Sequence, residues 1–292
     1  MRKIKELAIV KELASITDEN RISLNEIGWT SRVYIVDNGE FVFKFLKNKK
    51  YKEELEHEIN ILKLIQKHEF CVCIPSISIV GEGNTYIGCR GITGKSMTTK
   101  IISEFSEEQK RKIGAQIGLF LKKLHLIEYK GKSPSTENSI MEWFQESFSK
   151  RKRTLKKYFN EKELGFIEKL VASLPQRSAK LGIEEVFCHG DLGYNNILLT
   201  NDLEVGVIDF GDAGNLDKSY DFIGIEDDVI LDSAIIAYGD DDVLREKVAI
   251  RRQLLPLMEM LFLIDRKEKE EIRKHINTIR NNIKARGINE SE

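Results

Sequence analysis

The sequence lacks several features that mark large classes of protein. Its 292 residues include only four cysteines, and they are too scattered for a disulfide scaffold. Cys71 and Cys73 are too close in sequence for a useful cross-link, and no histidine stands near them at zinc-site spacing. Reduced thiols are typical of the cytoplasm, and we predict that localisation.

An excess of charge and long apolar segments are also missing. The 46 basic and 47 acidic side chains leave a net charge of −1, which gives no indication of a nucleic-acid or membrane partner. The N-terminus has charges but no apolar signal segment, and no apolar run approaches membrane-spanning length. The length suits one large domain or two smaller lobes.

The polar residues that carry chemistry are concentrated between residues 188 and 222. Two short apolar runs, 197–199 and 205–208, predict strands joined by a turn at Asn201-Asp202. Polar side chains that a core does not require flank this hairpin: His189, Asp191, Asn196, Asp209 and Asp212. Because magnesium prefers hard oxygen ligands together with substrate phosphates, the mouth of the hairpin predicts a magnesium and phosphate site.

These motifs resemble those of a known group. His189-Gly190-Asp191, with Asn196 and Ile208-Asp209-Phe210-Gly211, is similar to the catalytic and metal-binding loops of the aminoglycoside phosphotransferase and choline kinase family. Protein kinases have His-Arg-Asp, four residues, Asn and then Asp-Phe-Gly. Gly190 replaces that arginine, which indicates the small-molecule branch.

The resemblance covers nearly the whole chain and is dense at 40–62, 86–94 and 186–228. It implies an α+β, two-lobed protein-kinase-like fold. The N-lobe, residues 1–90, would bind nucleotide with a small antiparallel sheet and one main helix. The hinge would lie at about 88–94, and residues 95–292 would form a larger, mostly helical catalytic and substrate-binding lobe.

A lysine inside an apolar strand is the main feature of the predicted N-lobe. By alternation Lys44 shares a face with Val42 and Leu46, where an unpaired charge is costly. The helix expected over 51–68 has an apolar stripe that Glu58 adjoins. The resemblance selects the same glutamate, so we predict that Lys44 pairs with Glu58 and reaches the nucleotide phosphates. Alternatively, Lys44 is an edge-strand lysine that extends to solvent.

Other nucleotide contacts are implied by the resemblance. The loop at 28–31 would cover the phosphates, with Thr30 and Ser31 hydroxyls as donors, although G-x-G-x-x-G is missing and a plain hairpin explains the loop equally well. The base would bind backbone groups at Cys89, Gly91 and Ile92. Tyr86 would narrow the base pocket; a buried core tyrosine is the alternative.

In this family the roles of the hairpin residues follow the motif. Asp191 would orient the attacking hydroxyl, and Asn196 and Asp209 would hold Mg2+ against the phosphates of ATP or GTP. His189 and Asp221 would support the catalytic loop.

Acidic residues after the metal loop suggest the second substrate. The acidic cluster after Asp221 looks most like that of the 2″-phosphotransferases, and an aminoglycoside is a polycation. The predicted acceptor-binding residues are Asp212, Glu226, Asp227 and Asp228. Alternatively, residues 226–228 cap a helix N-terminus.

The sequence therefore predicts a phosphotransferase that moves the γ-phosphate of a nucleoside triphosphate to a hydroxyl of an aminoglycoside antibiotic and confers resistance. We expect a monomer or weak dimer. A kinase for another small alcohol (a macrolide, amino alcohol or sugar) fits the same catalytic residues. A protein kinase is disfavoured by Gly190 and by the missing Ala-Pro-Glu motif. A pseudokinase acting as a binding module would need a broken catalytic set, whereas all five positions are present.

Overall fold

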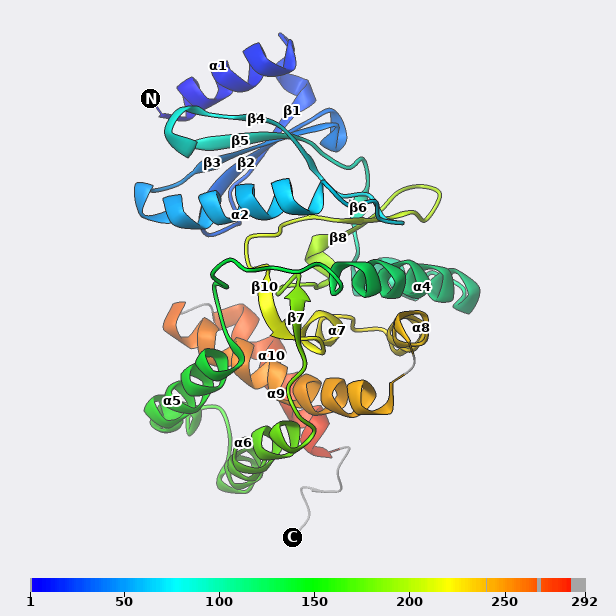
Figure 1. Ribbon diagram of the computed structural model, residues 1–292. Helices are drawn as coiled ribbons and strands as arrows, with labels where there is room; N and C mark the ends of the chain where they lie inside the picture. Colours follow the sequence, from blue (N-terminus) through cyan, green and yellow to red (C-terminus); the bar gives the residue numbers. More distant parts are fainter. Residues whose placement is uncertain (1, 240, 267–268, 285–292) are drawn as a thin grey trace.

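The computed structural model describes residues 2–239, 241–266 and 269–284. An N-terminal sheet with helices on its two faces lies above a mostly helical C-terminal part (Figure 1). This is the α+β, kinase-like fold that the motifs predicted.

The N-terminal sheet is antiparallel, with the order β1-β2-β3-β5-β4. Its strands are β1 (Ile22–Asn25), β2 (Ser31–Val36), β3 (Phe41–Leu46), β4 (Ser76–Val80) and β5 (Tyr86–Arg90). Helix α1 (Arg2–Ala14) covers one face of the sheet and α2 (Lys52–Ile65) lies along the other (Figure 1).

The two faces of the sheet have different cores because side chains alternate along each strand. Phe43 and Phe45 of β3 pack with Tyr34 and Val10 on the α1 side. On the α2 side, Leu46 packs with the helix and with residues of the C-terminal part. The face of β3 that carries Lys44 is therefore the one turned toward the rest of the molecule.

Helix α1 is attached to the sheet by a buried ion pair. Arg32 of β2 donates to both carboxylate oxygens of Glu6, at 2.8 and 2.6 Å, and each residue is less than a tenth exposed. Val10 is fully buried beside them, whereas Ile4 is 72 % exposed.

The chain leaves β5 and pairs briefly with the C-terminal part. Strand β6 (Lys95–Ser96) joins β8 (Ile197–Leu199) and β9 (Val205–Val207) in a second sheet, so the predicted hairpin is present. Strands β7 (Glu185–Cys188) and β10 (Gly214–Asp217) form a third, antiparallel sheet.

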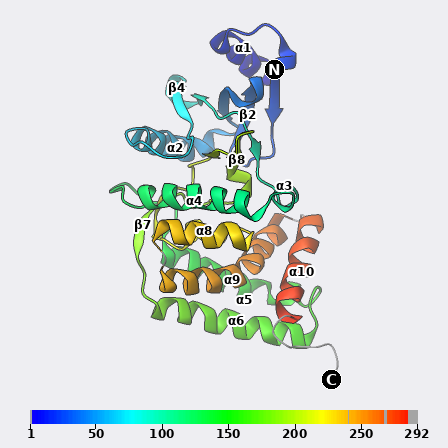
Figure 2. The ribbon, with the colours of Figure 1, turned by 90° about the vertical axis from the view of Figure 1, so that its right-hand side faces the viewer.

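The remainder is helical. The bounds are α3 (Thr99–Ser103), α4 (Glu107–Leu124), α5 (Glu137–Leu155), α6 (Glu161–Lys180), α7 (Tyr220–Ile223), α8 (Asp228–Tyr238), α9 (Asp242–Arg266) and α10 (Lys269–Lys284). Capping boxes begin three of these helices, at Ser106, Thr136 and Asn160. Helices α4 and α8 lie side by side beneath the β8–β9 hairpin, and α9 lies below α8 (Figure 2).

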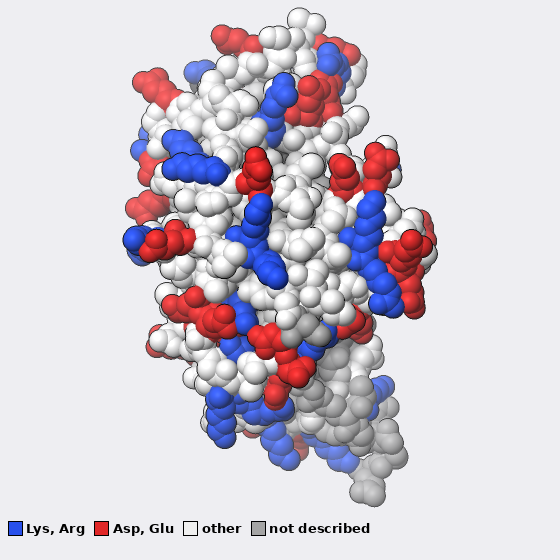
Figure 3. Space-filling view, turned by 45° about the vertical axis from the view of Figure 1, so that its right-hand side comes forward, with Lys and Arg blue, Asp and Glu red and all other residues white. Residues whose placement is uncertain are grey.

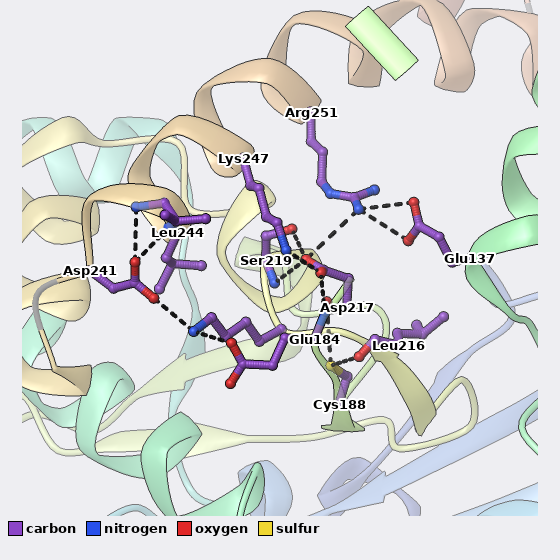
Figure 4. A network of polar contacts seen from close by, with 12 residues as sticks. Glu137, Glu184, Cys188, Leu216, Asp217, Ser219, Asp241, Leu244, Lys247 and Arg251 are labelled. Carbon is purple, nitrogen blue, oxygen red and sulfur yellow. Dashed lines mark hydrogen bonds and ion pairs between the residues drawn. The ribbon is translucent and has the colours of Figure 1, made fainter. Parts of the chain in front are cut away.

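A buried network of charges attaches α9 to β10 (Figure 4). The Lys247 ammonium donates to Asp217 at 2.6 Å, and these two residues are 2 % and 0 % exposed. Arg251 donates to Glu137 of α5 at 2.9 Å, and Ser219 donates to Asp217 at 2.6 Å. Because each buried carboxylate has a cationic partner, the network fixes β10 and the following turn against α9.

The surface carries charges of both signs. On the face in Figure 3, basic and acidic side chains are interspersed. All four cysteines are free thiols. Among the described helices, none combines the length and the apolar character needed to cross a bilayer.

Candidate active site

Three charged residues from distant parts of the chain meet beneath the sheet. The Lys44 ammonium donates to Glu58 Oε1 at 2.5 Å and to Asp209 Oδ1 at 3.0 Å. The side chains of Lys44 and Glu58 are 18 % and 9 % exposed, whereas that of Asp209 is 54 % exposed. The expected Lys44–Glu58 pair is therefore present, and its open side faces the metal loop.

Charge complementarity determines the ionisation of this group. Burial disfavours the Lys44 ammonium, but the carboxylates of Glu58 and Asp209 outweigh that effect and raise its pKa. The nearby ammonium of Lys44 lowers the pKa of Asp209 despite burial. Burial raises the pKa of Glu58 against the pull of Lys44. Lys44 and Asp209 are thus held charged at neutral pH.

The catalytic loop is held by Asp221 at the start of α7. This fully buried carboxylate accepts from the backbone N–H groups of His189 at 2.8 Å and Gly190 at 2.9 Å, and from the His125 ring at 3.0 Å. Burial raises the pKa of Asp221, but the hydrogen bond from His125 and the charges nearby lower it overall. The His189 ring donates to the Ile208 carbonyl at 3.0 Å, which ties the catalytic loop to β9 and the metal loop. These contacts are those of the supporting roles predicted for His189 and Asp221.

Gly190 allows the catalytic and metal loops to approach each other closely. Its φ is +86°, and a Cβ atom there would lie 2.3 Å from the carbonyl oxygen of Asp212. A side chain at this position would push the metal loop away. Asp209 also has a positive φ, +67°, which is unusual for a residue with a side chain and requires support from its surroundings.

Asp191 lies in a field of neighbouring carboxylates. Burial and then the charge of Asp212 raise its pKa to about 6, against the lowering effect of a hydrogen bond from Asn196. That bond measures 2.9 Å. Burial and the charge of Asp209 raise the pKa of Asp212 as well. Among the described residues, no cation forms an ion pair with Asp212 or Asp191.

Asn196 and Asp209 provide donors that suit a divalent cation. The Asn196 amide nitrogen donates to the Asp191 carboxylate and backbone carbonyl, so its carbonyl oxygen is the atom left for a metal. Asp209 is ionised and half-exposed. One carboxylate and one amide oxygen, completed by phosphate oxygens and water, match the preference of Mg2+.

The loop expected to cover the phosphates is held at its base by a lysine. Lys47 donates through its side chain to the carbonyls of Glu26, at 2.5 Å, and Gly28, and its backbone N–H donates to Thr30 at 2.7 Å. The hydroxyls of Thr30 and Ser31 lie 3.5 Å apart where β2 begins. The run 47–50 reads as a solvated loop in sequence, so this role of Lys47 had no clear signal.

The residues predicted to contact the base divide between the two faces of the sheet. Lys44 pairs with Ile87 across β3 and β5, whereas Tyr86 pairs with Phe45 and stacks on it at 4.8 Å. Tyr86 therefore packs on the α1 side, and the prediction that it narrows the base pocket is wrong. The contacts of Tyr86 agree instead with the alternative prediction, a core tyrosine.

The connector after β5 has only some of the free backbone groups that were predicted to bind the base. Cys89 is on the Lys44 face, where burial and the charge of Glu58 raise its pKa to about 12. The Gly91 N–H is used by the Glu40 carbonyl at 2.9 Å, so only the Gly91 carbonyl remains for a base. Ile92 is buried and packs on Gly206 of β9.

The acidic cluster after Asp221 has mixed roles. Asp227 caps α8 through the N–H groups of Val229 and Ile230 and accepts from Lys110 at 2.8 Å. Asp228 pairs with Arg252 at 2.9 Å. The capping alternative is therefore correct for Asp227, and we remove it from the acceptor-binding set because its carboxylate is already committed. We also remove Asp228 from the acceptor-binding set, because Arg252 already pairs with its carboxylate.

Glu226 remains near the centre, together with an acid that sequence reasoning missed. Burial and the charges of Glu226 and Asp191 raise the pKa of Glu259 on α9 to about 7. Glu226 accepts from the Thr99 hydroxyl at 2.8 Å. The signal for Glu259 was its position as the one acid in Leu257-Met258-Glu259-Met260-Leu261, although the sequence gives no sign of which element it faces.

A histidine next to Glu58 was also missed. The His57 Nε2 atom donates to the carbonyl of Ala213 at 2.8 Å. Neighbouring residues of α2 thus hold Lys44 and the segment after the metal loop, so the position of this helix affects both.

A buried lysine–glutamate pair, a metal-loop aspartate and a catalytic-loop aspartate, arranged between a sheet and a helical lobe, define a kinase-like phosphotransferase. A family model described as "Phosphotransferase enzyme family" matches residues 21–242, and the chain belongs to this family.

Solved structures with the same fold have different substrates in their names. The GDP and kanamycin complex of APH(2″)-IIIa has a TM-score of 0.82 at 20 % identity, covering 98 % of this chain and 100 % of that one. The macrolide 2′-phosphotransferase MphH from Brachybacterium faecium has a TM-score of 0.66 at 16 % identity, covering 93 % and 97 %. A choline/ethanolamine kinase family protein from Mesorhizobium loti has a TM-score of 0.67 at 15 % identity, covering 98 % and 95 %. At these identities the likeness establishes the fold alone.

Proposed function

We propose that this phosphotransferase transfers the γ-phosphate of ATP or GTP to a hydroxyl of an aminoglycoside, an activity that confers antibiotic resistance. The supporting observation is the negative charge gathered around Asp191, where neither Asp191 nor Asp212 has a cationic partner among the described residues. Asp191, Asp212 and Glu259 all have raised pKa values because each is buried near another carboxylate. Of the three, Glu259 also contacts the ring of His275 on α10, at 3.2 Å. An acceptor with several ammonium groups would relieve this repulsion, whereas a neutral sugar or a macrolide with one amine would relieve less of it.

Each residue of the centre has a role in this reaction. Asp191 accepts a hydrogen bond from the acceptor hydroxyl and directs its oxygen at the γ-phosphorus. Lys44 binds the phosphates, and Glu58 holds the ammonium in place. Asn196 and Asp209 would hold Mg2+, which neutralises phosphate charge when bound. Asp212, Glu226 and Glu259 bind acceptor ammonium groups.

The donor would lie between the sheet and the hairpin. The 28–31 loop covers its phosphates, and its base lies against the connector at Cys89, Gly91 and Ile92. GDP in the complex of APH(2″)-IIIa makes GTP a donor to test beside ATP. Tyr86 is on the opposite face of the sheet, and the residue of β5 that pairs with Lys44 is Ile87. We therefore expect no aromatic side chain of β5 to restrict which nucleotide base can bind.

The test is a nucleotide-coupled assay with kanamycin, gentamicin, choline and erythromycin, each with ATP and with GTP. We expect turnover with the aminoglycosides. Turnover restricted to choline or erythromycin would replace the acceptor class and leave the phosphotransferase chemistry in place.

Charge-removing variants test the acceptor site. Asp212→Asn and Glu259→Gln should each raise the KM for the aminoglycoside by about tenfold to a hundredfold, because each removes one charge-assisted contact. Glu246→Gln is the matched control, because Glu246 is an acid on the same helix that pairs with Arg177. Equal KM values for Glu259→Gln and Glu246→Gln would contradict the assignment.

A further inference from the structure

An aromatic contact joins the loop over the donor phosphates to helix α9. The rings of Trp29, in the loop between β1 and β2, and Phe262, on α9, meet edge to face with centroids 6.3 Å apart. These residues belong to the two different parts of the fold, so their contact crosses from the N-terminal sheet to the helical lobe. Both rings keep about half of their surface, at 53 % and 42 % exposed.

The Trp29 side of the contact is fixed to the donor site. Lys47 donates to the carbonyls of Glu26 and Gly28, which lie just before Trp29. The Lys47 N–H donates to Thr30, which follows it. Lys47 directly follows Leu46, the last residue of β3, and β3 is the strand that carries Lys44. A movement of the loop that brings it onto phosphates therefore also moves Trp29.

The Phe262 side of the contact is fixed to the acceptor site. Phe262 follows Glu259 by three positions on α9, so the two side chains are neighbours on one helix face. Arg252, on the same helix, donates to the backbone carbonyl of Glu226 at 2.8 Å, and the charges of Glu226 and Asp191 raise the pKa of Glu259, so α9 runs beside the proposed acceptor site. The other end of α9 is anchored by Lys247 and Arg251 in the buried network (Figure 4). Helix α9 is thus the support on which the Trp29 ring rests.

We propose that Trp29 and Phe262 are positioning residues that couple the donor and acceptor sites. A nucleotide bound beneath the loop holds Trp29 in this contact, and the contact holds the acceptor side of the cleft in its binding arrangement. Nucleotide and acceptor then bind with positive cooperativity, by the same factor in either order. An edge-to-face aromatic pair supports a factor of about threefold to tenfold. The inference rests on the proposed phosphoryl transfer for the placement of the two substrates.

The chain offers a direct spectroscopic test because it has two tryptophans, Trp29 and Trp143. A Trp143→Phe background, altered on α5 away from the cleft, leaves Trp29 as the single emitter. The probe is the magnesium complex of a β,γ-imido analogue of GTP or ATP, and the readout is acrylamide quenching. We expect the nucleotide to shield Trp29, the added substitution Phe262→Ala to abolish the shielding, and Phe262→Tyr to restore it. Equal shielding with and without the Phe262 ring would overturn the proposal.

A binding cycle measures the coupling itself. The Kd of kanamycin is measured by calorimetry with and without saturating nucleotide analogue in the parent, in Trp29→Ala, in Phe262→Ala and in the double variant. We expect the nucleotide to tighten kanamycin binding threefold to tenfold in the parent and to have no effect in any of the three variants.

Two results would count against the coupling. One is that nucleotide still tightens kanamycin binding in either single variant. The other is that the double variant loses more of this tightening than each single variant does. A parent enzyme that neither binds nor phosphorylates kanamycin would refute the proposed acceptor instead. In that case the quenching experiment, which uses nucleotide alone, still decides whether nucleotide holds Trp29 against Phe262.

Discussion

Replacing Lys44 with methionine should destabilise the protein through the charge that it leaves behind. Glu58 is only 9 % exposed at its side chain and lies 2.5 Å from the lysine, so its carboxylate would lose its counter-ion in a buried position. Removing one partner of a buried pair costs about 3–5 kcal/mol. The half-exposed Asp209 adds little, because water screens it. We expect a loss of about 3 kcal/mol in the free energy of unfolding, or roughly 6–12 °C in Tm.

A second substitution separates the buried charge from the lost lysine. Lys44→Met with Glu58→Gln removes both charges, and we expect it to recover at least half of the lost stability. Both variants should lose turnover about a hundredfold, because neither binds the phosphates with an ammonium group. Lys52→Met is the matched control: Lys52 is on α2, the helix that carries Glu58, but it forms an exposed pair with Glu56, so its loss should leave the free energy of unfolding unchanged.

The stability that Lys44→Met loses relative to wild type should also depend on pH. The folded-state pKa of Glu58 is already raised by burial, and loss of Lys44 raises it further. The folded single variant therefore takes up a proton at a higher pH than the unfolded chain, and its deficit relative to wild type shrinks as pH falls toward about 4.5. Urea denaturation between pH 8 and pH 5 measures this. A pH-independent deficit, or a double variant no more stable than the single one, would refute the buried-charge explanation.

Three further variants test other parts of the centre. Asp191→Asn should lower turnover by about two orders of magnitude or more while Tm and nucleotide Kd stay unchanged; near-normal turnover would remove Asp191 from its role. Asp212→Asn removes a charge that raises the pKa of Asp191, so the acidic limb of kcat/KM, expected near pH 6 in the parent, should move to lower pH; an unmoved limb would show that Asp212 does not act on Asp191. Lys247→Met should lower the free energy of unfolding by about 3 kcal/mol because Asp217 loses its ammonium and keeps only the Arg251 guanidinium, at 3.8 Å, and adding Asp217→Asn should recover part of the loss; a Lys247→Met Tm equal to wild type would contradict the role given to this network.

The clustering of the proposed catalytic residues could be predicted from sequence because their spacing along the chain is itself distinctive. Asp191, Asn196 and Asp209 stand around one hairpin, where local pairing fixes their neighbourhood. The Lys44–Glu58 pair was predicted because Lys44 is a charge in an apolar strand and Glu58 is the acid next to the apolar stripe of the following helix. Each inference used a short-range period or a motif, and the structure brings these residues together.

The residues that were misplaced depended on long-range register. Tyr86 and Ile87 are adjacent, and which of them shares a face with Lys44 depends on how β5 pairs with β3. A shift of one residue in that pairing would exchange the two, and no local pattern specifies it. The role of Asp227 also depended on a distant residue. In sequence this acid fits either an acceptor site or a helix cap, and in the structure it caps α8 and pairs with Lys110 of α4.

The sequence by itself determined the proposed chemistry: the residues that we assign to phosphate binding, metal binding and catalysis are specified by residue type and spacing. Tertiary structure alone decided which other side chains surround them, including Glu259 from α9, His57 above the metal loop and the Trp29–Phe262 contact. The physical reason is that motif geometry is set by neighbouring backbone, whereas the field and shape of a cleft depend on how distant helices pack against it.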